Sequence, residues 1–103
     1  MTIYQMLSAG LDIPVIYSHF RNKSEAVDPP YVAYIGAGQN NFEADNTYYH
    51  NANRYQIEYY FTKKDESEEA KIEELLLENG YLYEKSEDVY IEDENVFVIY
   101  YNV

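Results

Sequence analysis

The segment from Asn53 to Lys64, NRYQIEYYFTKK, decides which fold this sequence can adopt. Its apolar residues recur at every second position, which is the repeat of a β-strand with one buried face. That face consists of Tyr55, Ile57, Tyr59 and Phe61. The opposite face carries Tyr60 together with Arg54, Gln56 and Glu58. We therefore expect a strand that turns one face to the core and still places a tyrosine on the other.

A helix is predicted directly after this strand, in residues 63–80, KKDESEEAKIEELLLENG. Asp65 is the expected N-cap, the acidic residues of the first turn suit the helix dipole, and Gly80 is the expected end. The expected buried stripe of this helix consists of Ile72, Leu75 and Leu76, which lie at helical spacing. This stripe would pack on the apolar face of the preceding strand.

The rest of the chain supplies one more helix and further strands. Thr2 and Gln5 have the spacing of a capping box, and Gly10 would end a short first helix. Strands are expected at 13–20 (IPVIYSHF), 31–38 (YVAYIGAG), 81–85 (YLYEK) and 96–101 (VFVIYY), and the acidic residues 86–95 are expected to form a solvated turn. Residues 1–103 are thus expected to be a single α+β domain, an antiparallel or mixed sheet with two helices on one face.

Residues 39–53, QNNFEADNTYYHNAN, are rich in asparagine and poor in aliphatic residues. A connection of this length and polarity cannot bury a core of its own. We expect it to form a long projecting β-hairpin arm that leaves the sheet at the glycines of Gly36–Gly38. Because aromatic side chains contribute much of the energy of interfaces, its expected contact residues are Phe42, Tyr48 and Tyr49.

Charge is distributed unevenly along the chain. The 103 residues carry a formal net charge of -12. Residues 1–64 hold six acids and five bases, whereas residues 65–103 hold thirteen acids and two bases. No basic stripe is available to replace the counterions of phosphates, so we expect no direct nucleic-acid binding. No segment is apolar over the roughly 18 residues that cross a bilayer, so we expect no membrane partner.

Residue types with catalytic or metal-binding chemistry are few. His19 and His50 lie in separate segments without a metal-binding spacing, and the chain has no cysteine. No motif for an activated nucleophile or a phosphate-binding loop is complete. The 14 tyrosines, against 4 phenylalanines, favour surfaces that become covered by a partner. We therefore expect no enzymatic activity, no metal and no cofactor, but a role in binding or assembly.

Residues 13–20, 28–65 (DPPYVAYIGAGQNNFEADNTYYHNANRYQIEYYFTKKD) and 72–103 resemble the small tail proteins of long-tailed phages and prophages of low-GC Gram-positive bacteria. These belong to the tail terminator, or tail completion, group. The resemblance implies a subunit of a homo-oligomeric, hexameric ring that caps the tail tube protein, joins the head–tail connector protein and lets DNA pass. It implies a place in the virion tail, and in the host cytoplasm during assembly.

The same resemblance implies which surfaces neighbouring subunits cover. These are the arm with Phe42, Tyr48 and Tyr49, and the second face of the segment from Asn53 to Lys64, with Arg54 and Tyr60. A ring needs two different patches on each subunit, and the near-neutral first part and the acidic remainder offer such a pair.

Two other classes of protein remain compatible with the sequence. A head–tail connector or other minor virion protein would use the same kind of subunit at a neighbouring level of the particle. A small acidic inhibitor or regulatory protein would bind a host enzyme through its acidic face, as a mimic of DNA. Such a protein would be a monomer or a dimer, so ring formation separates it from the first two classes.

Overall fold

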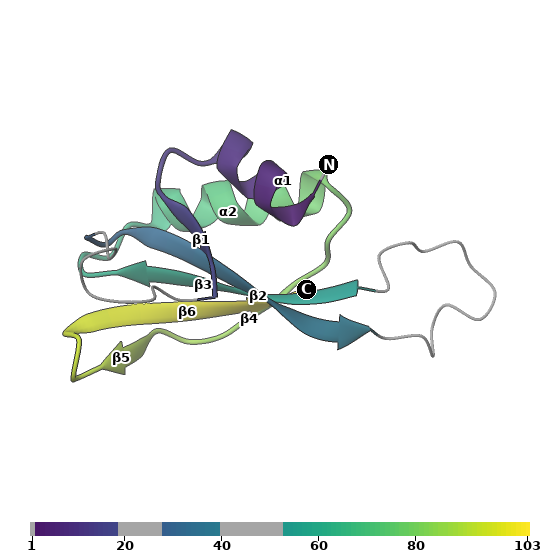
Figure 1. Cartoon of the computed structure of the whole chain (residues 1–103). Helices are drawn as coiled ribbons and strands as arrows, with labels where there is room; N and C mark the ends of the chain where they lie inside the picture. The colour runs from purple at the N-terminus through teal and green to yellow at the C-terminus, as the bar shows by residue number, and fades with distance from the viewer. Residues whose placement is uncertain (1, 19–27, 40–52) are drawn as a thin grey trace.

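A computed structural model describes residues 2–18, 28–39 and 53–103 (Figure 1). The predicted elements are present, and one strand is added to them. In chain order they are α1 (Ile3–Gly10), β1 (Val15–Tyr17), β2 (Tyr31–Gln39), β3 (Asn53–Phe61), α2 (Glu66–Glu78), β4 (Glu84–Lys85), β5 (Val89–Ile91) and β6 (Val96–Asn102).

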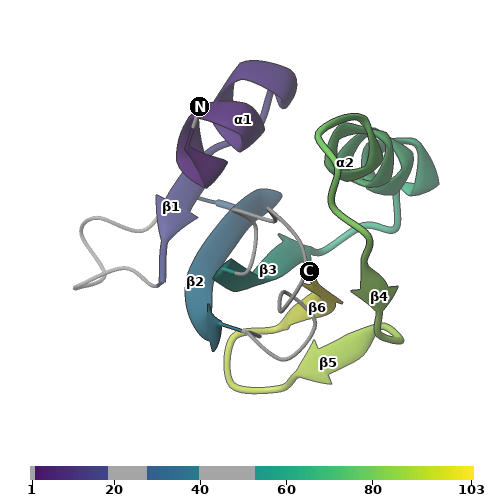
Figure 2. The same cartoon turned by 90° about the vertical axis from the view of Figure 1, so that its right-hand side faces the viewer.

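The six strands form one mixed sheet in the order β1-β2-β3-β6-β4, with β5 also paired to β6. β1 runs parallel to β2, and the other pairs are antiparallel. Both helices lie on the same face of this sheet (Figure 1, Figure 2). The predicted α+β class, with a mixed sheet and two helices on one face, is therefore confirmed.

β3 is the central strand and has the predicted alternation. Ile57, Tyr59 and Phe61 are at most 2% exposed and pack in the core beneath the helices. On α2, Ile72 and Leu76 are fully buried. Leu75, which the sequence placed in the same stripe, is only partly buried and lies against α1, where a β-carbon on Gly10 would come within 2.6 Å of its side chain. Gly10 thus permits the close approach of the helices.

Both helices have the caps that the sequence predicts. Thr2 and Gln5 form a capping box, with the Gln5 amide 3.1 Å from the Thr2 hydroxyl and the Thr2 amide 2.8 Å from the Gln5 side chain. At the start of α2, the Asp65 carboxylate accepts hydrogen bonds from the amides of Ser67 and Glu68. Gly80 follows the end of α2 with a φ of 85°, a conformation that favours glycine.

The β2–β3 hairpin extends beyond the layer of helices (Figure 1). Its pairing is regular from Tyr31 to Gly36 and then shifts register before Gln39, which lies opposite Asn53. Gly38, with a φ of 86°, lies in this irregular stretch, as expected for a bulge at this point. The predicted arm itself, with Phe42, Tyr48 and Tyr49, lies outside the described residues apart from its two ends.

The prediction for the last strands of the sheet was partly wrong. The strand expected at 81–85 is paired only at β4, and the expected acidic turn at 86–95 contains β5. Lys85 lies opposite Tyr101 and Val89 opposite Val98, so β4 and β5 lie along the same edge of β6. Three residues (86–88) connect them where β6 has two (99–100), which is one extra residue on the edge. This strand was missed in the sequence because acidic residues flank it on both sides. At the edge of a sheet, such residues can point to solvent while Val89 and Ile91 are partly buried.

The two neighbouring leucines Leu76 and Leu77 test the packing of α2. Leu76 is fully buried, whereas Leu77 is 52% exposed. Leu76→Ala should lower the free energy of unfolding by about 2 to 5 kcal/mol, because it leaves a cavity, and Leu77→Ala should lower it by less than about 1 kcal/mol. Urea denaturation of both variants measures this difference, and equal losses would show that α2 packs through another face.

Candidate functional site

The face of the sheet away from the helices carries Arg54 and Tyr60, two of the five residues that the sequence assigned to subunit contact. Arg54, Gln56, Glu58 and Tyr60 alternate along β3 with the buried residues, so they point to this second face. Strand pairing places Tyr31 opposite Tyr60, Ala33 and Tyr100 on either side of Glu58, and Val98 opposite Tyr60. We call this set of residues on β2, β3 and β6 the second face.

Part of the second face is apolar although both described helices lie on the other side of the sheet. Val98 is fully buried and Ala33 is 1% exposed. The rings of Tyr31 and Tyr60 stack beside them with centroids 4.8 Å apart. The Tyr60 hydroxyl donates a hydrogen bond of 2.6 Å to Glu58 Oε1. Burial, and then this hydrogen bond to a carboxylate, raise the pKa of Tyr60, so its hydroxyl stays protonated as a donor.

Arg54 lies at the other end of the same face. Tyr60 lies six positions further along β3, a distance of roughly 20 Å, so the two predicted contact residues do not touch. Its side chain is partly buried and forms no ion pair with any residue in the described part of the chain. Nearby, Gln56 Nε2 donates a hydrogen bond of 3.3 Å to Asn102 Oδ1. The second face therefore has an aromatic end and a polar end that carries a positive charge.

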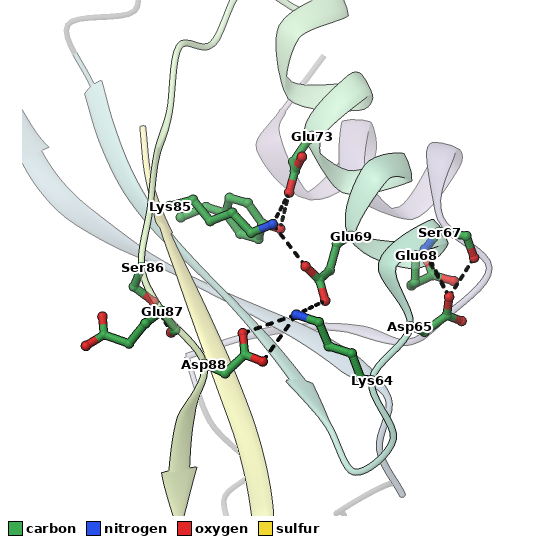
Figure 3. Close-up of polar contacts among 11 residues, drawn as sticks. Lys64, Asp65, Ser67, Glu68, Glu69, Glu73, Lys85, Ser86, Glu87 and Asp88 are labelled. Carbon is green, nitrogen blue, oxygen red and sulfur yellow. Dashed lines mark hydrogen bonds and ion pairs between the residues drawn. The ribbon is translucent and has the colours of Figure 1, made fainter.

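A cluster of ion pairs on the helix side was not predicted from the sequence (Figure 3). Its centre is Glu69 of α2, whose side chain is 3% exposed. Lys64, just after β3, lies 2.7 Å from Glu69 Oε2, and Lys85 of β4 lies 2.9 Å from Glu69 Oε1. Lys64 also lies 3.2 Å from Asp88, and Lys85 lies 2.7 Å from Glu73. We call these five charged residues the Glu69 cluster.

The Glu69 cluster also satisfies a tyrosine hydroxyl in the core. Tyr101 is fully buried, and its hydroxyl donates a hydrogen bond of 2.8 Å to Glu73 Oε2. Burial alone would raise the pKa of Glu73, but the hydrogen bonds from Lys85 and Tyr101 outweigh it and lower the pKa. Hydrogen bonds to Glu73 and Glu69 likewise outweigh burial and raise the pKa of Lys85.

The ion pairs of the Glu69 cluster hold neighbouring elements of the fold together. Both lysines have raised pKa values, Lys64 mainly through its hydrogen bond to Glu69, so they stay protonated and are poor nucleophiles. Lys64 connects the segment after β3 to α2, and Lys85 connects the short edge strand β4 to α2. One feature of the sequence indicates that Glu69 is buried. It lies three residues before Ile72, on the same side of the helix as the buried stripe.

Comparison with known proteins leaves the family resemblance as a hypothesis. No protein-family model, no curated protein and no solved structure matches this chain. Within residues 2–18, 28–39 and 53–103, no group of three or more histidine, cysteine or acidic side chains could hold a metal ion. No helix in these ranges is long and apolar enough to cross a membrane.

Neutralising Glu69 tests whether the cluster stabilises the fold. Removing one partner of a buried ion pair costs about 3 to 5 kcal/mol, but Lys64 and Lys85 are 43% and 35% exposed and can regain water. We expect Glu69→Gln to lower the free energy of unfolding by about 1 to 3 kcal/mol. Glu66→Gln, an exposed change in the same helix, corrects for the lower net charge. If both variants have equal stability in urea, the cluster contributes nothing.

The lowered pKa of Glu73 predicts how stability depends on pH. Its contribution is complete above the unfolded pKa of about 4.3 and is lost as the pH falls through the lower folded pKa. Thermal melts between about pH 6 and pH 2 should therefore show a smaller loss of stability on acidification for Glu73→Gln than for the wild type. Glu74→Gln, an exposed neighbouring change, should keep the wild-type profile. Identical profiles for all three proteins would contradict the assignment.

Proposed function

We propose that this chain is a structural protein of a phage tail, a tail terminator that caps the tail tube as an oligomeric ring and joins it to the head connector. The resemblance of residues 13–20, 28–65 and 72–103 to such proteins suggests the function. The second face of the sheet is the observation that supports it best. The proposed subunit contacts are Arg54 and Tyr60 on that face. Phe42, Tyr48 and Tyr49, which lie outside the described residues, are proposed to join them.

The second face has the composition of a protein contact. Interface centres are enriched in tyrosine and arginine and depleted in lysine and aspartate. Here Tyr60 lies opposite the buried Val98, Tyr31 stacks on Tyr60, and Tyr100 is two residues from Val98 on β6. Arg54 lacks an ion pair among the described residues. A neighbouring acidic side chain would neutralise Arg54.

The distribution of charge is compatible with a ring. Closed rings form when one patch of a subunit contacts a different patch of the next. The first 64 residues hold six acids and five bases, and residues 65–103 hold thirteen acids and two bases. A near-neutral patch with Arg54 facing an acidic patch of the next subunit would satisfy this requirement. An acidic surface along the passage would let DNA slide through without binding.

Electron microscopy of phage particles made without this protein tests the function. A missing terminator leaves tail tubes without a stop, so tails of variable length that are not attached to heads are expected. Tails of normal length beside unattached heads would instead assign the protein to the connector. Normal infectious particles, together with a protein that remains monomeric in solution, would overturn the proposal and favour the acidic regulatory class.

Arg54→Glu tests the proposed contact directly. By analytical ultracentrifugation, the wild-type protein should form a species of about six times the 12.2 kDa of one chain. Reversing the charge of Arg54 should dissociate this species and leave the melting temperature of the subunit within a few degrees, because Arg54 has no ion pair among the described residues to lose. Lys63→Glu makes the same change at an exposed site after β3 and should keep the ring. A ring unaffected by Arg54→Glu would place the contact elsewhere.

A further inference from the structure

The strand β1 forms one edge of the sheet and lies beneath α1 (Figure 2). The Pro14 carbonyl and the Ser18 amide both bond to β2. Because backbone groups alternate in direction along a strand, those of Ile16 also face β2, whereas those of Val15 and Tyr17 face outward. Among the described residues, none bonds these four outward groups. The edge is therefore open to pairing with another strand.

Exposed aromatic side chains border this edge on the helix side. Tyr17 is 64% exposed and Tyr4, on α1, is 46% exposed. Both rings contact Tyr34 of β2, with centroids 5.5 Å away for Tyr17 and 6.2 Å away for Tyr4. The three tyrosines thus form one connected surface beside the open backbone. They offer apolar area that a second molecule at this edge can cover.

The two edges of the sheet differ in charge. No charged residue lies in β1 or among residues 32–34, which pair with it. β5, at the opposite edge, has acidic residues directly before it and after it, at 87–88 and 92–94. Charged residues commonly protect an edge strand against pairing. A second copy of the chain, with the same net charge of -12, is therefore repelled less at β1 than at β5.

The open edge of β1 is complementary to itself. Two antiparallel copies of β1 can place Ile16 opposite Ile16 of the second copy, and Val15 of each chain then lies opposite Tyr17 of the other. Val15 and Tyr17 carry the outward backbone groups, so all four groups of each chain form hydrogen bonds. On the helix side, valine faces tyrosine, a pairing of aromatic and β-branched side chains that stabilises sheets. A second copy therefore satisfies every open group of the edge.

We infer that two copies of this chain pair edge to edge through β1, about a two-fold axis, and form one continuous sheet. Both helix layers then lie on the same side of that sheet. The hydrogen bonds of two short strands do not by themselves offset the loss of freedom on association, so burial of the tyrosine rings has to contribute. The contact is small, and small contacts are weak, so we expect dissociation in the micromolar range.

This pairing does not rest on the proposed ring. It uses β1, whereas the ring contact uses Arg54 and Tyr60 on the second face. A two-fold contact joins subunits only in twos, so the pair describes the chain outside the ring. The Arg54→Glu chain, in which the proposed ring contact is removed, is therefore the background for ultracentrifugation. It should form a species of about twice the 12.2 kDa of one chain as the concentration rises.

Amide hydrogen exchange tests the register of the pair in the unmodified chain. Exchange at Val15 and Tyr17 should slow as the concentration rises from micromolar to millimolar, because pairing bonds their amides. The Ile16 amide, which faces β2, should be protected at every concentration. The amide of Tyr90, in β5 at the opposite edge, should not respond. Exchange at Val15 and Tyr17 that is independent of concentration would overturn the inference.

A matched pair of substitutions separates the two edges of the sheet. Tyr17→Lys should weaken the pairing about tenfold or more, because it replaces the ring that packs beside Val15 of the second copy. Tyr90→Lys makes the same change at an exposed tyrosine in the middle of β5 and should leave the pairing unchanged. Loss of the pair in Tyr90→Lys but not in Tyr17→Lys would assign the contact to the other edge and contradict the inference.

A charge exchange at Ile16 tests the two-fold axis, because this residue faces its own copy across the axis. In the Arg54→Glu background, Ile16→Lys and Ile16→Glu should each sediment as monomers, since like charges meet. An equal mixture of the two should form the pair again. With both variants shown to be folded by their amide spectra, a mixture that stays monomeric would refute this register. If either variant is unfolded, the exchange at Val15 and Tyr17 decides the question.

Discussion

The register of β3 is the constraint on which the rest of the structure depends. A shift by one residue would move Ile57, Tyr59 and Phe61 from the helix side to the second face. The register of β3 also aligns both neighbouring strands, because Ile57 lies opposite Tyr34 on β2 and opposite Tyr101 on β6. The buried face of α2 then has one place to pack, over Ile57 and Tyr59.

The tyrosines act differently on the two sides of this sheet. On the helix side, the buried Tyr101 needs a partner for its hydroxyl and finds Glu73. On the second face, Tyr60 stacks on Tyr31 and donates its hydrogen bond to Glu58 on its own strand. Among the described elements, both helices lie on one side of the sheet, and tyrosine side chains cover part of the other side.

The Glu69 cluster explains how so acidic a chain keeps a short edge strand in place. β4 has two residues and is separated from β5 by three residues that are not paired as a strand, so backbone pairing alone holds it weakly. Lys85 adds two ion pairs to α2, and Lys64 joins Asp88, which precedes β5, to the buried Glu69. Two of the few bases in the chain are used in this way, which leaves the outer surface of α2 strongly acidic.

The sequence by itself determined the local structure, because local structure depends on spacing along the chain. The alternation from Tyr55 to Phe61, the caps Thr2 and Asp65, and the glycine after α2 all predicted their elements correctly, and the same alternation placed Arg54 and Tyr60 away from the helices. Only the tertiary structure decided that β1 is parallel to β2, that β5 pairs within an acidic segment, and that Glu69 meets two distant lysines. These features depend on contacts between residues far apart in the chain, and burial and charge pairing there override local preference.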